Sequence, residues 1–128
     1  MANTMAWPPK KILIVEDDEV NLLIAEHVLG KAGYEVSSVN NGELAIEAIG
    51  QTPFDLVLMD IEMPLMDGLE AAQHIRELPH GRRVPIIALT AHTLPEKLAQ
   101  IEQAGMNGYL IKPFELNKFD AVLHEQIS

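Results

Sequence analysis

The chain has 128 residues, which fits one domain and is long enough to bury a hydrophobic core. Its 19 acidic and 9 basic residues leave a formal charge of −10, which disfavours direct binding to nucleic acid or to an anionic membrane surface. The chain has no cysteine, which excludes disulfides and thiolate metal sites. No apolar run approaches the ~18 residues of a membrane span. Because of these two features, we expect a cytoplasmic location.

The first part of the chain divides into a lead-in, a strand and a helix. Residues 1–9 hold the single tryptophan and two prolines, so they are predicted to be a flexible lead-in or linker before one domain at 10–128. The apolar run 12–15 predicts a strand that is buried on both faces. Helical spacing follows, and the apolar residues of this helix are predicted to form one stripe: Val20, Leu23, Ile24 and Val28.

The remainder of the chain repeats the pattern of strand and then helix. The further predicted strands are short, mostly apolar runs bounded by turn-forming residues: 34–39, 56–59, 84–89 and 108–111. The further predicted helices carry apolar residues three or four positions apart: 43–49, 68–78, 95–104 and 116–127. This alternation predicts an α/β domain, a doubly wound sheet of five parallel strands with helices on both faces.

Four of the predicted strands end in side chains that can take part in chemistry. These side chains are, in chain order, Glu16 with Asp17, then Asp60, Thr90 and Lys112. The carboxyl ends of parallel strands share one edge of a sheet, and open α/β sheets bind their ligands at that edge. We therefore expect three carboxylates, one hydroxyl and one ammonium group to lie together.

This cluster has the composition of a site for phosphoryl groups. Carboxylates placed close together repel one another and raise the pKa of at least one of them, and a bound Mg²⁺ ion would remove that conflict. Lys112 adds a cation for an anionic oxygen, and Thr90 adds a hydrogen-bond donor. A carboxylate beside a metal ion and an ammonium group is a plausible nucleophile toward phosphorus. The cluster thus predicts phosphoryl transfer onto Asp60 by positioning and charge neutralisation.

The motifs around these positions match one known family. They are, in chain order, Val15-Glu16-Asp17-Asp18, Met59-Asp60, Met63-Pro64, Asp67-Gly68, Leu89-Thr90-Ala91 and Tyr109-Leu110-Ile111-Lys112-Pro113-Phe114. In this order and spacing they make the chain resemble the receiver domain of two-component response regulators, which has a flavodoxin-like fold. The segments 59–68 and 104–109 are most similar to receivers of hybrid histidine kinases or of multistep phosphorelays.

The resemblance implies a role for each residue of the cluster. Asp60 would accept phosphate from the phosphohistidine of a histidine kinase or a histidine phosphotransfer protein. Mg²⁺ would be bound by the side chains of Asp17 and Asp60, by the backbone carbonyl of Glu62, and by Glu16 through water. Lys112 would hold the phosphoryl group. Such a domain is a signalling module that promotes only its own phosphorylation and dephosphorylation, and it is not counted as an enzyme.

The resemblance also implies a switch. Thr90 would move to form a hydrogen bond with the phosphoryl group, assisted by the amide of Ala91. Tyr109 would then rotate inward to fill the space that Thr90 leaves. Glu62 and His92 occupy positions that vary within the family, and they are expected to tune how readily water attacks the acyl phosphate.

The resemblance further implies two interaction surfaces and one backbone feature. The face formed by residues 95–125 is expected to be the output surface, and it offers a surface for a homodimer. The partner kinase or phosphotransfer protein is expected to dock near the helix at 20–29, where Leu22→Asp should weaken transfer without unfolding the domain. The Lys112–Pro113 peptide bond is expected to be cis.

Two alternatives remain open from the sequence. The first is a metal-dependent phosphohydrolase that forms an aspartyl phosphate, although such enzymes normally carry an Asp-x-Asp pair after the first strand. Here the nucleophile candidate, Asp60, follows the third strand, and its neighbour two residues on is Glu62. The second alternative is a receiver-like interaction module that is never phosphorylated, which the complete set of site residues argues against.

Overall fold

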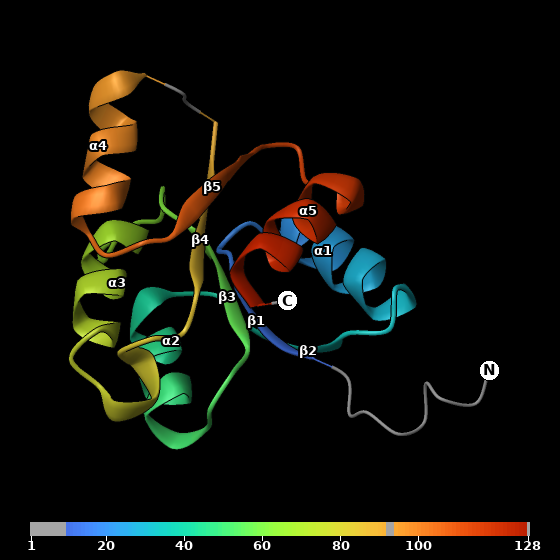
Figure 1. Cartoon of the computed structure of the whole chain (residues 1–128), viewed down its shortest axis with the longest axis horizontal. Helices are drawn as coiled ribbons and strands as arrows, with labels where there is room; N and C mark the ends of the chain where they lie inside the picture. The colour runs from blue at the N-terminus through green and yellow to red at the C-terminus, as the bar shows by residue number, and fades with distance from the viewer. Residues whose placement is uncertain (1–9, 92–93, 128) are drawn as a thin grey trace.

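The structure is a computed structural model that describes residues 10–91 and 94–127. The predicted lead-in at 1–9 and the tuning position His92 lie outside the described residues. One sheet runs through the molecule with helices packed on both of its faces (Figure 1). Its five parallel strands follow the order β2-β1-β3-β4-β5. The predicted fold class is therefore confirmed.

The strands and helices alternate along the chain as predicted. The strands are β1 (Lys11–Val15), β2 (Glu35–Val39), β3 (Leu56–Asp60), β4 (Ile86–Thr90) and β5 (Gly108–Ile111). The helices are α1 (Glu19–Lys31), α2 (Gly42–Gln51), α3 (Gly68–Ile75), α4 (Pro95–Gln103) and α5 (Leu116–Ile127), with a short 3₁₀ helix η2 (Pro79–Gly81). No helix within 10–91 or 94–127 combines the length and the apolar composition that a bilayer-spanning segment requires.

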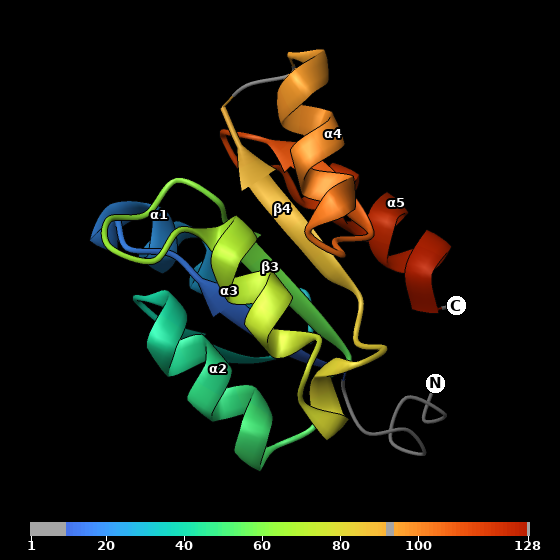
Figure 2. The same cartoon turned by 90° about the vertical axis from the view of Figure 1, so that its left-hand side faces the viewer.

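Two hydrophobic cores form, one on each face of the sheet. Helices α2, α3 and α4 cover one face, which Figure 2 shows from their side, and their buried residues include Ala45, Ile75 and Ile101. Helices α1 and α5 cover the other face, where Leu29 and Phe119 are fully buried. Strand β3 is buried along its whole length because it lies in the middle of the sheet with helices over both faces.

Helix α1 begins where predicted, but it does not bury the predicted stripe. Val20 is 64% exposed and Leu23 is 58% exposed, whereas Ala25 and Leu29 face the core. Apolar residues occur on more than one side of this helix, so their spacing alone could not identify the buried side. Leu22 packs partly against the core, and we therefore expect Leu22→Asp to destabilise the domain rather than report on docking.

Helix α3 ends at Ile75, three residues before the predicted end at Leu78. The chain then turns sharply through Gly81, whose backbone lies against the carbonyl of Ile75. A Cβ atom added to Gly81 would come within 2.0 Å of that oxygen, so only glycine fits there. The turn is consequently packed directly onto the end of α3.

Arg76 connects this turn to the segment between α4 and β5. Its guanidinium group is half-buried, and its acceptors at 2.6 to 2.9 Å are the carbonyls of Gly81, Val84 and Gly105 and the side chain of Asn107. All five N–H groups of the side chain are used. Burial lowers the pKa of Arg76. One side chain thus joins the turn at Gly81 and Val84, five to eight residues further on, to the segment at Gly105 and Asn107, 29 to 31 residues further on.

We predict that Arg76→Lys lowers the free energy of unfolding by about 2 kcal/mol, because an ammonium group has three donors and lacks the planar fork that reaches these acceptors. Urea denaturation measures the change. Arg82→Lys is the matched control, since Arg82 is exposed on the same turn, and its effect should stay within about 0.5 kcal/mol. Equal effects of the two substitutions would contradict the structural role of Arg76.

Candidate functional site

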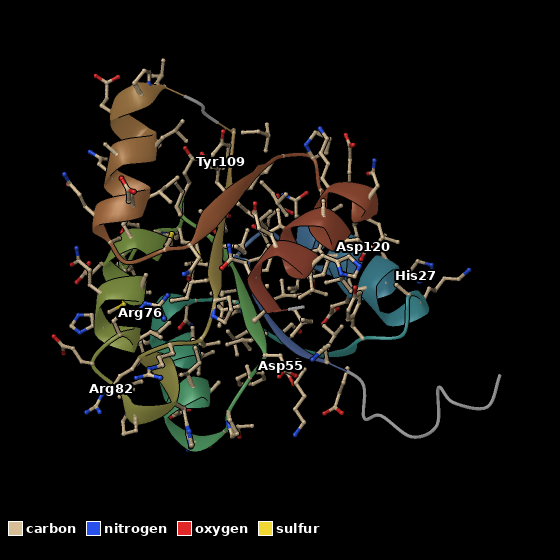
Figure 3. All side chains as sticks on the ribbon, viewed as in Figure 1. His27, Asp55, Arg76, Arg82, Tyr109 and Asp120 are labelled. Carbon is tan, nitrogen blue, oxygen red and sulfur yellow. The ribbon has the colours of Figure 1, made fainter. Side chains whose placement is uncertain are left out.

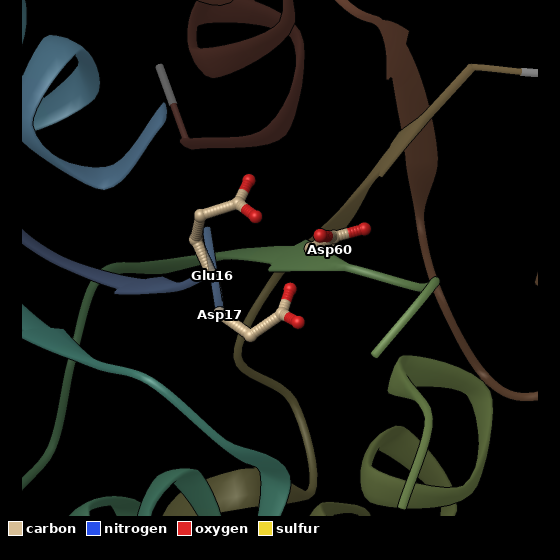
Figure 4. Close-up of side chains that lie close together, drawn as sticks. All are labelled: Glu16, Asp17 and Asp60. Carbon is tan, nitrogen blue, oxygen red and sulfur yellow. The ribbon is translucent and has the colours of Figure 1, made fainter. Parts of the chain in front are cut away.

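Three carboxylates meet at the carboxyl edge of the sheet. Glu16 and Asp17 follow β1, and Asp60 ends β3 (Figure 4). One carboxylate oxygen from each of the three lies within 4.8 Å of those of the others. The register explains this closeness, because Val15 pairs with Met59 and the next residue on each strand is an acid.

Two of these carboxylates are buried and held by backbone amides. Glu16 is 2% exposed and Asp60 is 1% exposed, while Asp17 lies open to solvent. The N–H of Asp18 donates to Glu16 Oε2 at 3.1 Å, and the N–H of Glu62 donates to Asp60 Oδ1 at 2.9 Å. These donors orient the two side chains, so the edge of the sheet presents fixed oxygens rather than mobile surface acids.

Lys112 supplies the cation of the site. Its Nζ lies 3.0 Å from Asp60 Oδ2 and 3.8 Å from Glu16 Oε1. Strand β5 delivers it there, because Thr90 pairs with Ile111 and the N–H of Lys112 donates to the Thr90 carbonyl at 2.9 Å. Burial opposes the charge on Lys112, but the hydrogen bond with Asp60 and the nearby carboxylates raise its pKa. The Lys112–Pro113 bond is cis, as expected.

The environment of Glu16 favours its neutral form. Burial, the hydrogen bond with Asp60 and the negative charge of Asp60 raise the pKa of Glu16 to about 8, and Lys112 only partly offsets them. One ammonium group is therefore insufficient for two buried carboxylates. This imbalance was predicted from the sequence, and a divalent cation would remove it.

The donor set fits Mg²⁺. This ion prefers oxygen ligands and normally binds to one or two carboxylates while keeping several of its waters. Glu16 and Asp60 provide oriented carboxylates, and the exposed Asp17 leaves one side open to water and ligands. Glu62 lies beside the cluster, since its amide contacts Asp60 directly. These four residues are the ones predicted from the sequence to bind the metal ion.

The expected switch residues lie on the neighbouring strands. Thr90 ends β4 and is fully buried, one residue beyond the position that pairs with Asp60, and Ala91 follows it at the surface. Tyr109 lies on β5, is 41% exposed, and borders a groove of about 220 Å³ between α4 and β5 (Figure 3). Tyr109 is thus turned at least partly toward solvent in this structure.

Two residues contribute to the site in ways that sequence reasoning missed. Asp18 caps α1, accepting the amides of Val20 and Asn21 at 2.9 and 3.1 Å. Gly68 lies so close to the site that a Cβ atom there would come within 2.4 Å of the Asp60 carbonyl. For Gly68 the available signal was the dipeptide Asp67-Gly68 at the start of α3, which joins the acid that caps this helix to a residue without a side chain.

Comparison with known proteins identifies one family. The family profile described as the response regulator receiver domain matches residues 12–124. The sensor histidine kinase GacS of Pseudomonas protegens is 41% identical over 113 residues, and the histidine-protein kinase BarA of Escherichia coli K12 is 38% identical over 112 residues. These matches cover 86% and 88% of this chain but only 12% of each kinase.

Solved structures agree with the sequence matches. The chemotaxis protein CheY4 of Vibrio cholerae has a TM-score of 0.88 at 31% identity, covering 93% of this chain and 99% of that one. The receiver domain of the sensor histidine kinase PA1611 of Pseudomonas aeruginosa has a TM-score of 0.86 at 41% identity, covering 93% of this chain and 98% of that one. That receiver domain has a magnesium ion coordinated in its active site cleft.

We predict that the stability of the metal-free protein falls as the pH rises from about 5 to about 8. In this window the unfolded chain has released the Glu16 proton, since its ordinary pKa is 4.5, while the folded chain keeps it until about pH 8. A divalent cation at the cluster would favour the ionised form of Glu16, so Mg²⁺ should raise the melting temperature more at about pH 8 than at about pH 5. Thermal unfolding with and without Mg²⁺ measures both effects.

Glu16→Gln is the control for this experiment, because it removes the titrating proton and keeps the shape of the side chain. The variant should lose the part of the pH slope that belongs to Glu16. Identical slopes for the wild type and the variant would show that Glu16 does not titrate in this window.

Proposed function

The chain belongs to the response regulator receiver domain family, and on this premise we propose that it takes a phosphoryl group from a phosphohistidine onto Asp60. The observation that carries this proposal is the contact of 3.0 Å between Lys112 Nζ and Asp60 Oδ2, beside the carboxylates of Glu16 and Asp17. A buried carboxylate that is fixed by an amide and an ammonium group is well placed to act as a nucleophile.

The transfer forms one bond and breaks another. A carboxylate oxygen of Asp60 bonds to phosphorus while the bond from phosphorus to the imidazole nitrogen breaks, and the imidazole keeps the electron pair. The amide of Glu62 and the ammonium group of Lys112 hold Asp60 in place for the attack. Lys112 then stays with the phosphoryl oxygens as negative charge builds up at the buried site.

Mg²⁺ is the proposed cofactor. We assign its ligands to the side chains of Asp17 and Asp60 and the backbone carbonyl of Glu62, with Glu16 acting through water. The ion would neutralise the carboxylates and the incoming phosphoryl oxygens. The clustered carboxylates and the magnesium ion in the related receiver of PA1611 support this assignment.

Phosphorylation would be read by the neighbouring strands. In the proposed switch Thr90, the Ala91 amide and Lys112 bind the phosphoryl group, and Tyr109 turns inward. The face formed by residues 95–125 then changes shape and serves as the output surface or as a homodimer contact. The position of Thr90 at the end of β4 and the outward position of Tyr109 support this sequence of events.

The phosphodonor would dock on helix α1 beside the site. Val20, Leu23 and Ile24 present exposed apolar side chains there. A groove of about 190 Å³ is lined by Ile24, Phe114 and Lys112 among others. An apolar helix from a histidine kinase or a phosphotransfer protein fits this surface.

We assign residues 10–128 to the receiver module and residues 1–9 to a lead-in. The family match at 12–124 falls inside the proposed module. The chain spans about an eighth of the length of the sensor kinases that it matches. We therefore propose that the module works inside a cytoplasmic phosphorelay, as a signalling domain rather than as an enzyme with an external substrate. Neither alternative, the phosphohydrolase or the unphosphorylated module, gains support from the relatives.

We predict that Asp60→Asn abolishes transfer from a radiolabelled phosphohistidine donor in the presence of Mg²⁺, because a neutral carboxamide is a far weaker nucleophile toward phosphorus than a carboxylate and cannot form the acyl phosphate. Asp55→Asn is the matched control. It makes the same change at the other edge of the sheet, where Asn still accepts the hydrogen bond from Lys11, so it should be labelled normally. Labelling of Asp60→Asn at the wild-type level would refute the assignment of the phosphoacceptor.

We predict that Leu23→Asp slows phosphotransfer about tenfold, since it places a charge on the apolar docking surface. Leu44→Asp on α2 is the control, because Leu44 is also an exposed leucine on a helix but belongs to a different helix from the proposed docking surface. Rapid-quench kinetics measure the rate, and urea denaturation should show changes within about 0.5 kcal/mol for both variants. Equal rates for the two variants would place the donor elsewhere.

A further inference from the structure

A second groove lies at the amino edge of the sheet, at the opposite end of the strands from the phosphoacceptor. It has a volume of about 530 Å³ and is open to solvent. Its lining combines apolar and basic side chains: Phe54, Pro79, Val84, Pro85, Arg82 and Arg83. In Figure 3, Asp55 and Arg82 lie on this lower part of the molecule, while Tyr109 lies at the other end.

The two arginines outnumber the one carboxylate in the lining of this groove, so its formal charge is +1, although the whole chain is strongly acidic. Within the described residues, neither Arg82 nor Arg83 forms a hydrogen bond or an ion pair through its side chain. The one carboxylate in the lining, Asp55, accepts the amide of Lys11 at 2.7 Å. Lys10 and Lys11 enter the sheet at the same edge but do not line the groove, and Glu35 pairs with Lys11 there.

The turn that carries the two arginines is rigid. Gly81 is packed onto the end of α3, and Arg76 holds the carbonyls of Gly81 and Val84 at 2.8 and 2.6 Å. Arg82 and Arg83 lie between these two anchored residues. Their backbone therefore loses little freedom when a ligand binds, which favours a preformed site.

We propose that this groove binds an acidic polypeptide segment that also carries apolar side chains, presented by a partner protein. Guanidinium groups bind carboxylates in a bidentate manner, and Phe54 with the two prolines offers contact surface for an apolar side chain. A nucleic acid or an anionic membrane would also meet the −10 charge of the whole chain, whereas a short peptide meets only the basic edge.

Fluorescence anisotropy tests the proposal with a labelled peptide that is rich in glutamate and carries interspersed leucines. The same peptide with glutamine in place of glutamate is the probe control. Binding of the acidic peptide should weaken about tenfold or more in Arg82→Glu/Arg83→Glu, and it should weaken further as salt is added. Lys97→Glu/Lys118→Glu makes the same change of charge on α4 and α5, away from the groove, and should bind within about twofold of the wild type.

Three outcomes would overturn the proposal: no binding of the acidic peptide by the wild type, equal loss in both double variants, or equal binding of the glutamine peptide. Binding of a short DNA duplex in preference to the peptide would also overturn it. Amide chemical shifts should move around residues 82–85 on titration with the peptide. Asp60→Asn should bind the peptide as the wild type does, so this test stands apart from the test of the phosphoacceptor.

Discussion

The structure depends on one electrostatic arrangement, in which a single ammonium group faces two buried carboxylates at the edge of the sheet. Lys112 contacts Asp60 closely and Glu16 more loosely, and the pKa of Glu16 is raised as a result of its burial and its neighbour. Burying a charged side chain without enough opposite charge beside it is unfavourable, and here one ammonium group faces two buried carboxylates. The site is therefore held in a state that a further cation would stabilise.

The remaining parts of the fold place these groups. Parallel strands bring all carboxyl ends to one edge, and the register of β1 with β3 and of β4 with β5 sets which side chains are neighbours. Gly68 allows α3 to begin directly against the backbone of Asp60. Two separate cores hold the helices on either face, so the edge itself can stay polar and open.

The sequence predicted the order of the elements and the composition of the site well, because both depend on local patterns. Buried strands appear as apolar runs, and each run that matters here ends in a side chain with a clear chemical use. The buried side of α1 was not predicted correctly, since Val20 and Leu23 are as apolar as the residues that face the core. The roles of Arg76 and Gly81 could not be predicted, because their partners are distant in sequence or depend on the path of a turn.

The guanidinium group of Arg76 has a consequence for how the two ends of the molecule respond to their surroundings. Its acceptors are amide oxygens, which do not titrate between acidic and basic conditions and which mobile ions screen only weakly when buried. The carboxylate edge, in contrast, holds Glu16, whose pKa of about 8 makes its charge depend on acidity. The part of the domain that Arg76 holds together therefore keeps its contacts over a range of acidity in which the charge of the carboxylate edge changes.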